Sequence, residues 1–431
     1  MESWKQITES LQLQNADGSA LTLRPNTRGD RVIWSVVALL VLISLLAVYS
    51  STGSLAYKHN KGNTEYYLFR QVTFIIIGVG IIYFTHLLDY RWFSKVALWF
   101  YVISIPLLIY TLFFGTNLNE ANRWIRLPVI NLTFQTSDFA RLALFMYLAR
   151  QLSRKQNIIN NFKQGYLPLI LPIVVTCLLI VPANLSTALL TGATGMLVIF
   201  LGRASLKHLL LTAVVMLLPV AILIAFAYST YDPNAIDKAA PKSSAMVNAI
   251  KHEGRVGTWM RRIQDFAFAK KDETPYQVQQ AKIAIAKGGW VGTGPGNSEQ
   301  RNFLPHPYSD FIYAIIIEEY GMIGGILIVF LYLTFLYRSI RLFRKCPYAF
   351  GAFLALALSI TLAIQAIANM GVAVNVLPVT GVTLPLVSMG GTSFLFTCFA
   401  IGIILSVARN VEVAESKTKV VNESEEEIET E

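Results

Sequence analysis

Charge is scarce in this sequence of 431 residues. Asp, Glu, Lys and Arg together make up 14% of it, whereas roughly 25% is usual in soluble globular proteins. Hydrophobic residues make up 54% and gather in long uncharged runs, between which Lys and Arg form short clusters. Such a distribution is typical of a protein that crosses a membrane several times, and it excludes a soluble globular domain.

Cysteines and nucleotide-binding motifs are also few or missing. The sequence holds Cys177, Cys346 and Cys398, whose positions indicate neither a disulfide framework nor a zinc site. The loops expected on the cytoplasmic side carry no GxxxxGKS/T or GxGxxG element, which argues against an ATP-driven pump. The net charge of +10 does not indicate nucleic-acid binding, because most basic residues lie at the ends of the apolar runs.

The apolar runs predict an all-α polytopic membrane protein of about ten transmembrane helices, since about 20 residues are needed to span a bilayer. The runs are 32–50, 72–88, 96–114, 139–152, 167–181, 185–202, 209–228, 311–337, 350–372 and 384–407. Lys and Arg are concentrated in alternate connections, which predicts that the N and C termini are both cytoplasmic.

This topology divides the chain into three parts. Residues 1–31 form a cytoplasmic tail, 32–408 the ten-helix membrane domain, and 409–431 an acidic cytoplasmic tail, of which we expect the last dozen residues, rich in Glu, to be disordered. One large extracytoplasmic loop, about 229–309, carries two predicted amphipathic helices, at 248–268 and 277–287. They either lie on the outer membrane surface or form a cap that does not touch lipid.

Three segments expected on the outer side are rich in Gly, Pro, Asn, aromatic residues and charge: 119–137, 288–310 and 377–393. Irregular backbone at membrane depth is tolerated where it is buried in protein or lines a wet cavity. Because all three segments share one side of the membrane, they predict a cavity open to the outer leaflet.

Ionisable residues in or beside these segments are candidates for function. Asp138 and Arg141 lie at i and i+3 of a helix, where they can pair, either as a structural ion pair or as part of a site. Asp310 begins the eighth helix, so its carboxylate either caps that helix or performs chemistry. For Glu318 and Glu319, deeper in the same helix, packing and hydrogen bonding are favoured over catalysis.

The same three segments resemble the motifs of the shape, elongation, division and sporulation (SEDS) family. NEANRWIRLPVINLTFQTSDFARLA resembles the family's GARRWI…FQPSEFAKLA, and NVLPVTGVTLPLVSMGGTSF resembles its PVTG.PLPFVSYGGSS. Between them, the stretch containing FLPHPYSDFIYAIIIEEYGMIG resembles YLPEAHTDFIFA.I.EELG.IG. The likeness runs from about residue 31 to 409, and Gln365 and Asn369 also fit it.

The resemblance implies a peptidoglycan glycosyltransferase of the bacterial inner membrane. It implies that the chain polymerises lipid II into a growing glycan strand, together with a class B penicillin-binding protein that crosslinks the strands, and with other division proteins at the septum. It implies a catalytic role for Asp310, and Asp138 and Arg141 match the Glu and Lys of PSExxK. The predicted substrate-binding residues are Arg123, Trp124, Arg126, Asp138, Arg141, Arg301, Ser388, Gly390 and Gly391.

Several positions depart from the family pattern. Thr136 replaces a Pro, and Tyr308 replaces the His two residues before the catalytic Asp, so a His is not essential there. Asn184 and Ser186 stand in the PDxGTA motif, which argues against a catalytic Asp at 184 and favours the division member of the family over the elongation member.

In the predicted reaction, Asp310 takes the proton of the acceptor hydroxyl, and arginines hold the leaving pyrophosphate, because guanidinium binds phosphate in a bidentate manner. No cofactor is predicted with certainty. A divalent cation could also neutralise the pyrophosphate, although no ligand cluster predicts a metal site. Two alternatives are a lipid II flippase and a scaffold that only recruits the transpeptidase.

Overall fold

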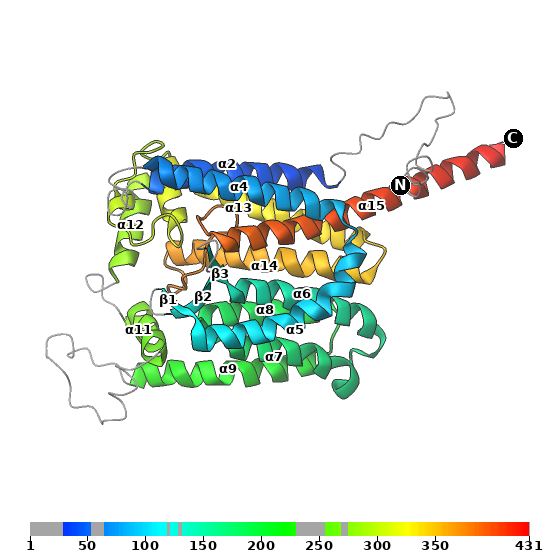
Figure 1. Cartoon of the computed structure of the whole chain (residues 1–431), viewed down its shortest axis with the longest axis horizontal. Helices are drawn as coiled ribbons and strands as arrows, with labels where there is room; N and C mark the ends of the chain where they lie inside the picture. Colours follow the sequence, from blue (N-terminus) through cyan, green and yellow to red (C-terminus); the bar gives the residue numbers. More distant parts are fainter. Residues whose placement is uncertain are drawn as a thin grey trace.

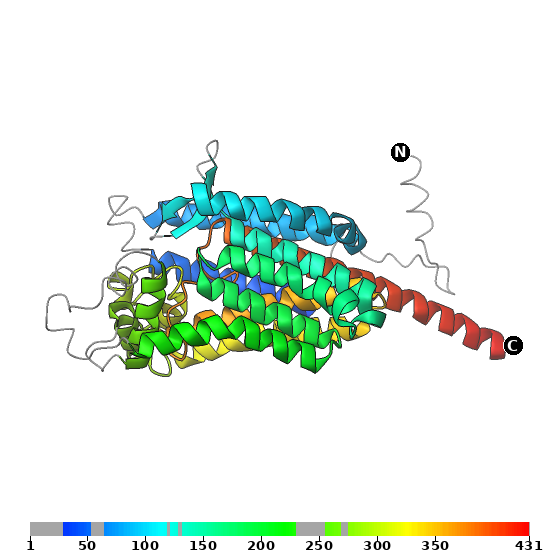
Figure 2. The same ribbon diagram turned by 90° about the horizontal axis from the view of Figure 1, so that it is seen from below.

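The computed structural model describes residues 29–52, 64–118, 121–127, 132–229, 255–268 and 275–430 (Figure 1). Within these ranges, the helices that correspond to the ten predicted runs pack side by side in one bundle (Figures 1 and 2). They are α2 Arg31–Ser51, α4 Thr64–Leu87, α5 Tyr90–Phe114, α6 Thr136–Lys155, α7 Leu167–Ile180, α8 Leu185–Leu201, α9 Leu206–Ser229, α13 Ile312–Lys345, α14 Ala349–Ala373 and α15 Thr392–Thr430.

Eight of the described helices are long and apolar enough to cross a membrane. The two other members of the bundle fall short of that standard for different reasons. Helix α8 has 17 residues, while α6 has 20 but carries charge at both ends, including Asp138 and Arg141 in its first turns. Both pack against α14, so their polar groups are protected by protein.

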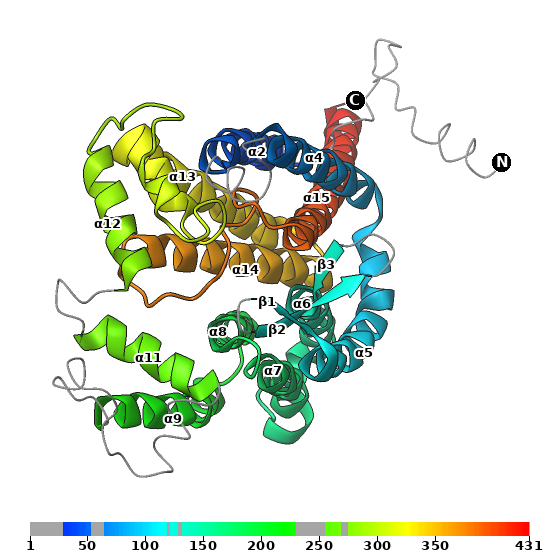
Figure 3. The same cartoon turned by 60° about the vertical axis from the view of Figure 1, so that its left-hand side comes forward.

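Helix α14 forms the centre of the bundle. It packs against α6, α8, α13 and α15, and its exposed positions are few (Figure 3). Small side chains, above all alanines, allow the neighbouring backbones to approach closely, as is usual between transmembrane helices. Helix α9 lies at the edge of the bundle, beside helix α11 Arg255–Phe268 (Figure 3).

A small antiparallel sheet between α5 and α6 was not predicted. It contains β1 Thr116–Leu118, β2 Ala121–Leu127 and β3 Leu132–Gln135, in that order, with Trp124 opposite Gln135. The sheet occupies the segment expected to be irregular, so the fold is not strictly all-α. Because β3 leads directly into α6, the sheet determines where Asp138 is placed.

The last predicted run, 384–407, was wrong at its beginning. Residues 384–391 are not helical, and α15 begins at Thr392. Pro385 and the pair Gly390–Gly391 disfavour helix, and Leu384 and Val387 are nevertheless buried. Ser44 of α2 donates to the Val387 carbonyl at 2.9 Å, which holds this non-helical segment inside the protein. At its other end α15 continues as a helix to Thr430, where we expected disorder.

Helix α13 is broken at Gly321, where one continuous helix was expected. Gly321 has a φ of +68°, and a Cβ there would collide with the Trp290 carbonyl, so only glycine fits. The glycine-rich chain around residues 289–294 fills the break. The Thr293 amide donates to the Glu318 carbonyl at 2.9 Å, and the Met322 amide donates to the Gly289 carbonyl at 2.9 Å.

The two predicted amphipathic helices of the long loop are present as α11 and α12 Tyr276–Gly288. Residues 248–254 of the first prediction lie outside the described residues. Both helices lie at the end of the bundle opposite the start of α2 and the projecting end of α15 (Figure 1). At that second end, Asp30 pairs with Arg338 at 2.6 Å, and Lys345 pairs with Glu415 at 2.7 Å. The assignment of this end to the cytoplasm stays a prediction.

Candidate functional site

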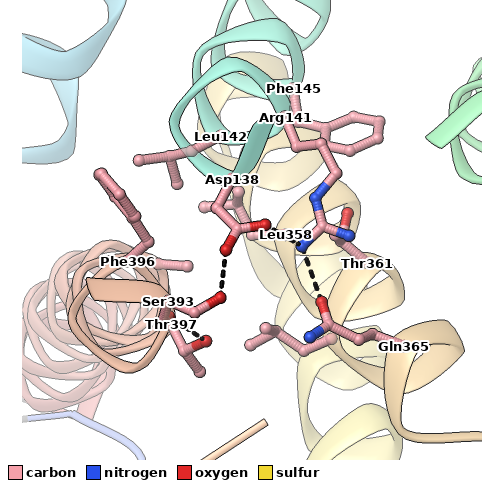
Figure 4. A pocket seen from close by; sticks show the side chains of 12 residues that line it. Asp138, Arg141, Leu142, Phe145, Leu358, Thr361, Gln365, Ser393, Phe396 and Thr397 are labelled. Carbon is pink, nitrogen blue, oxygen red and sulfur yellow. Dashed lines mark hydrogen bonds and ion pairs between the residues drawn. The ribbon is translucent and has the colours of Figure 1, made fainter. Parts of the chain in front are cut away.

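Asp138 and Arg141 form a buried ion pair in the first turns of α6. Arg141 Nη2 lies 3.2 Å from Asp138 Oδ1, and both side chains are about nine-tenths buried or more. Arg141 also donates to Gln365 Oε1 of α14 at 2.8 Å, and Ser393 of α15 donates its hydroxyl hydrogen to Asp138 Oδ2 (Figure 4). The i, i+3 pairing predicted from the sequence is therefore confirmed, within a network that joins three helices.

A pocket of about 390 Å³ lies beside this network, between α6, α14 and α15. Its polar residues are Asp138, Arg141, Thr361, Gln365, Ser393 and Thr397, and its apolar residues are Leu142, Phe145, Leu358, Leu362, Phe396 and Ala400 (Figure 4). Arg141 Nε is buried without a hydrogen-bond partner. A buried donor of this kind is costly unless something pairs with it, so the guanidinium has capacity for a further anion.

Asp310 lies in the turn before α13 and is half-buried. The N-cap residue of α13 is Phe311, which makes no side-chain capping bond, so Asp310 stands one residue before the N-cap position. The backbone at Asp310 is held from α14, because Asn369 Nδ2 donates to the Asp310 carbonyl at 2.9 Å. Ser388 donates to the neighbouring Ser309 carbonyl at 2.7 Å. Segments 288–310 and 377–393, two of the three expected on the outer side, are thus in contact beside Asp310.

Arg262 of α11 supplies positive charge to Asp310. Burial lowers the pKa of the Arg262 guanidinium, while the nearby charge of Asp310 acts to raise it. Burial also raises the pKa of the Tyr308 hydroxyl, and Asp310 raises it further, which places Tyr308 in the same surroundings. Sequence reasoning did not select Arg262. The only signal was a basic residue in a predicted amphipathic helix, 48 positions before the Asp by number.

One face of α14 connects the ion pair to Asp310. Gln365 accepts from Arg141 and donates to the Thr383 carbonyl at 3.0 Å. One turn later, Asn369 donates to the Val382 carbonyl at 2.7 Å and to the Asp310 carbonyl. Adjacent residues of the same non-helical segment are therefore held by two amides, and the buried pair and the half-buried carboxylate share one support.

The other predicted substrate residues are distributed around this centre. Trp124 and Arg126 lie in β2, with Trp124 half-buried and Arg126 exposed, and the side chain of Arg123 lies outside the described residues. Arg301 Nη1 donates to the Ser50 carbonyl at 3.0 Å, so it fastens the end of α2. Ser388 accepts from the Leu384 amide at 2.8 Å, which gives it a supporting contact.

Gly390 and Gly391 form the turn into α15, with Gly391 at a φ of +52°. Their backbone places Ser393 beside Asp138, as the bond between these two side chains requires. Glycine is favoured at a left-handed φ because it has no Cβ. A role for either glycine in binding substrate stays a prediction.

Glu318 and Glu319 are both buried and hydrogen-bonded, as predicted. Glu318 accepts from the amides of Glu299 and Gln300 at 3.0 and 3.3 Å, and from the Ser298 hydroxyl. Glu319 accepts from the Ser50 hydroxyl. These carboxylates hold the backbone of the loop that precedes Asp310, so they stabilise the position of that loop beside the site.

Metal binding is not indicated by the side chains that the structure describes. No three His, Cys, Asp or Glu residues among them gather closely enough to hold an ion. A divalent cation at the pyrophosphate therefore stays a prediction.

A family model described as "Cell cycle protein", covering FtsW, RodA and SpoVE, matches residues 30–413. The chain belongs to the FtsW/RodA/SpoVE family. Stage V sporulation protein E of Bacillus subtilis is 32% identical over 394 residues, which are 89% of this chain and 98% of that protein. The probable peptidoglycan glycosyltransferase FtsW of Trichlorobacter lovleyi is 30% identical over 391 residues, covering 89% and 94% of the two chains.

Solved structures share the FtsW/RodA/SpoVE fold. A chain from a structure titled for the coordination of polymerization and crosslinking by a peptidoglycan synthase complex has a TM-score of 0.67 and 23% identity, covering 89% of this chain and 98% of that one. The rod shape determining protein RodA of Thermus thermophilus has a TM-score of 0.60 and 21% identity, covering 89% and 97%. At these identities the likeness establishes the fold.

The FtsW/RodA/SpoVE fold also gives a structural reason for one departure noted in the sequence. Asn184 stands where the family motif has Asp, and its Oδ1 accepts from the Thr187 amide at 3.3 Å at the start of α8. Asn and Asp serve equally well as N-cap residues. A capping role explains why the position does not need a carboxylate, and the absence of a catalytic role there stays a prediction.

Proposed function

We propose that this chain is a peptidoglycan glycosyltransferase that polymerises lipid II into β-1,4-linked glycan strands on the outer face of the bacterial inner membrane. The observation that carries the proposal is the half-buried Asp310, whose backbone carbonyl accepts from Asn369 and whose charge interacts with that of Arg262. It shares its support on α14 with the buried Asp138–Arg141 network. The relative in Trichlorobacter lovleyi carries the same activity in its name.

The chemistry assigned to Asp310 is general base catalysis. The acceptor hydroxyl gives its proton to the carboxylate as its oxygen forms a bond to the anomeric carbon of the donor sugar. The bond between that carbon and the pyrophosphate oxygen breaks, and the lipid pyrophosphate leaves with the electron pair. A single displacement inverts the anomeric centre, which converts an α-linked donor into a β-1,4 bond. A positioned base typically contributes about 10²–10⁴-fold to the rate.

Arg141 is the residue we assign to the pyrophosphate. Its Nε is buried and unpaired, and a guanidinium can hold two phosphate oxygens at once. The pocket beside it is apolar in the part that lies along the helices, which suits the lipid end of the donor. Arg123 and Arg126 of the sheet, and Arg301, are the further cations predicted for the same group.

The partner we propose is a class B penicillin-binding protein. The likeness to a chain of a peptidoglycan synthase complex that coordinates polymerization and crosslinking supports a transpeptidase partner of this kind. We place the complex at the division septum with other division proteins, on the basis of the FtsW relatives. An elongation role is the alternative, and labelled protein concentrated along the side wall instead of at midcell would favour it.

Two further alternatives are a lipid II flippase and a scaffold without enzymatic activity. A transporter places its binding site near the membrane midplane, whereas Asp310 lies in a loop before the first residue of α13. Neither a flippase nor a scaffold forms polymer from lipid II in detergent. The enzyme and its two alternatives are therefore separated by one assay.

The test is to purify the chain with its transpeptidase partner, add lipid II and resolve the glycan products on a gel. The variant Asp310→Asn should lower the rate by about 10²-fold or more, because the amide cannot accept the proton. Glu299→Gln is the matched control. Its carboxylate is exposed on the same side of the protein, where it pairs with Lys287, and the variant should retain the normal rate. Normal polymerisation by Asp310→Asn would show that the base assignment is wrong.

A further inference from the structure

A second pocket, of about 600 Å³, lies at the outer end of the molecule. It is bounded by α11, by α12 and by the chain that follows α14. The residues that line it are Arg262, Asp265, Phe266, Pro275, Gln277, Val278, Lys282, Asn375, Pro378 and Val379. Helices α11 and α12 belong to the extracytoplasmic loop, so this pocket is separate from the one beside Arg141.

The lining of this pocket differs in kind from that of the pocket beside Arg141. It combines an exposed aromatic ring, Phe266, with the planar polar groups of Asp265, Gln277 and Asn375. Sugar rings present an apolar face that packs on an aromatic ring and a rim of hydroxyls that pair with carboxylates and amides. Arg262 and Lys282 add two cations to the lining. A sugar that carries carboxylates, such as a peptide-bearing amino sugar, matches all three features.

Arg262 connects this pocket to the proposed base. Its Nη1 donates to the Val379 carbonyl at 3.1 Å, and its charge interacts with that of Asp310. The chain from Asn375 to Val379 lines the pocket, and Val382, three residues further on, shares the amide of Asn369 with Asp310. A ligand in the pocket would therefore lie against the same support that holds the carboxylate.

We infer that this pocket is the subsite for the sugar that presents the acceptor hydroxyl to Asp310. The inference rests on the proposed glycosyltransferase activity, and it adds that the donor and the acceptor bind in two separate pockets. The pocket beside Arg141, with its mixed polar and apolar lining, takes the lipid pyrophosphate of the donor, and the pocket between α11 and α12 takes the anionic saccharide of the acceptor.

The test compares two charge reversals on α12, Lys282→Glu and Lys287→Glu, in the complex of the full chain with its transpeptidase partner. Lys282 lines the pocket, whereas Lys287 pairs with Glu299 and does not. We expect Lys282→Glu to raise the half-saturating concentration of lipid II about threefold to tenfold, the size expected for an exposed charge, with the maximal rate changed less than twofold. Lys287→Glu should change neither value by more than twofold.

A second measurement does not need turnover. A photocrosslinking residue, p-benzoylphenylalanine, placed at Gln277 should capture fluorescent lipid II, and the same residue at Lys287 should not. Equal capture at both positions, or none at Gln277, would overturn the subsite. So would an unchanged half-saturating concentration in Lys282→Glu together with loss of copurifying partner, since the pocket would then be a partner contact.

The two proposals fail in different ways. If the unmodified protein forms no polymer, the proposed function is wrong, and capture at Gln277 still reports whether saccharide enters the pocket. If polymer forms normally but Lys282→Glu behaves like Lys287→Glu, the function stands and the subsite is wrong.

Discussion

Helices α14 and α9 have nearly the same length and are both strongly apolar, yet they occupy opposite surroundings. In the membrane-spanning part of α14, 83% of the residues are buried inside the protein, and in that of α9 only 6% are. Helix α14 carries Gln365 and Asn369 among its apolar residues, whereas α9 has no polar side chain between residues 213 and 227. The polar side chains Gln365 and Asn369 therefore lie where protein, not lipid, surrounds them. Polar residues buried in a membrane bundle in this way are candidates for function.

The largest effect should come from breaking the network that α14 shares with α6. Arg141→Ala removes one partner of a buried pair and leaves Asp138 with an uncompensated charge, which costs about 3–5 kcal/mol. We expect both a lower melting temperature and loss of polymerisation, measured on the same purified sample.

The double variant Asp138→Ala with Arg141→Ala separates two roles of this pair. It removes both charges, so stability should recover in part. Activity should stay lost if Arg141 holds the pyrophosphate. Recovery of polymerisation along with stability would instead favour a purely structural ion pair.

A matched pair of leucine truncations should sharpen the contrast between the two helices. Leu356 of α14 is 2% exposed and Leu211 of α9 is 58% exposed. Leu356→Ala should lower the free energy of unfolding by about 2–4 kcal/mol, because it leaves a cavity among packed side chains. Leu211→Ala should change it by less than about 0.5 kcal/mol. Thermal unfolding in one detergent measures both. Similar losses would mean that α9 is covered by protein in solution, for example by a second molecule.

Replacing Asn369 should cost less stability than Arg141→Ala or Leu356→Ala, and its two variants should differ in their effect on activity. Asn369→Ala removes the side-chain amide that donates to the Val382 and Asp310 carbonyls and should cost about 1–3 kcal/mol. Asn369→Asp has the same shape but turns acceptors toward two carbonyls, so it should lower the maximal rate of polymerisation more than Asn369→Ala does. If Asp is tolerated better than Ala, the side chain serves only to fill space.

Local patterns in the sequence predicted the helices and the ion pair, because both depend on neighbours within one or two turns. Asp138 and Arg141 share a face of α6 whatever surrounds them, and an apolar run of sufficient length forms a helix in a membrane. The prediction of a helix from apolar residues was wrong at 384–391, because Pro385 and Gly391 impose a turn there. The surrounding helices bury this turn.

Contacts between distant parts of the chain could not be predicted in this way. Arg262 lies near Asp310 because α11 packs beside α9, where Gln264 donates to the Ala227 carbonyl at 2.8 Å. The glycines around residue 290 indicated irregular backbone, but not that this backbone would fill a break in α13. The strands of the small sheet are short, and pairing between them, not the pattern within each, determines their register.

The break at Gly321 also decides which part of the molecule carries the base. The piece of α13 before the break accepts hydrogen bonds from the chain at 293–294, and the piece after the break donates to the same chain at 289–290, so this chain joins the two pieces. Asp310 stands just before the first of the two pieces. A protein that pulled or pressed on the chain at 289–294 would thus act on both pieces of α13, and through the piece before the break it would act on the segment that carries Asp310.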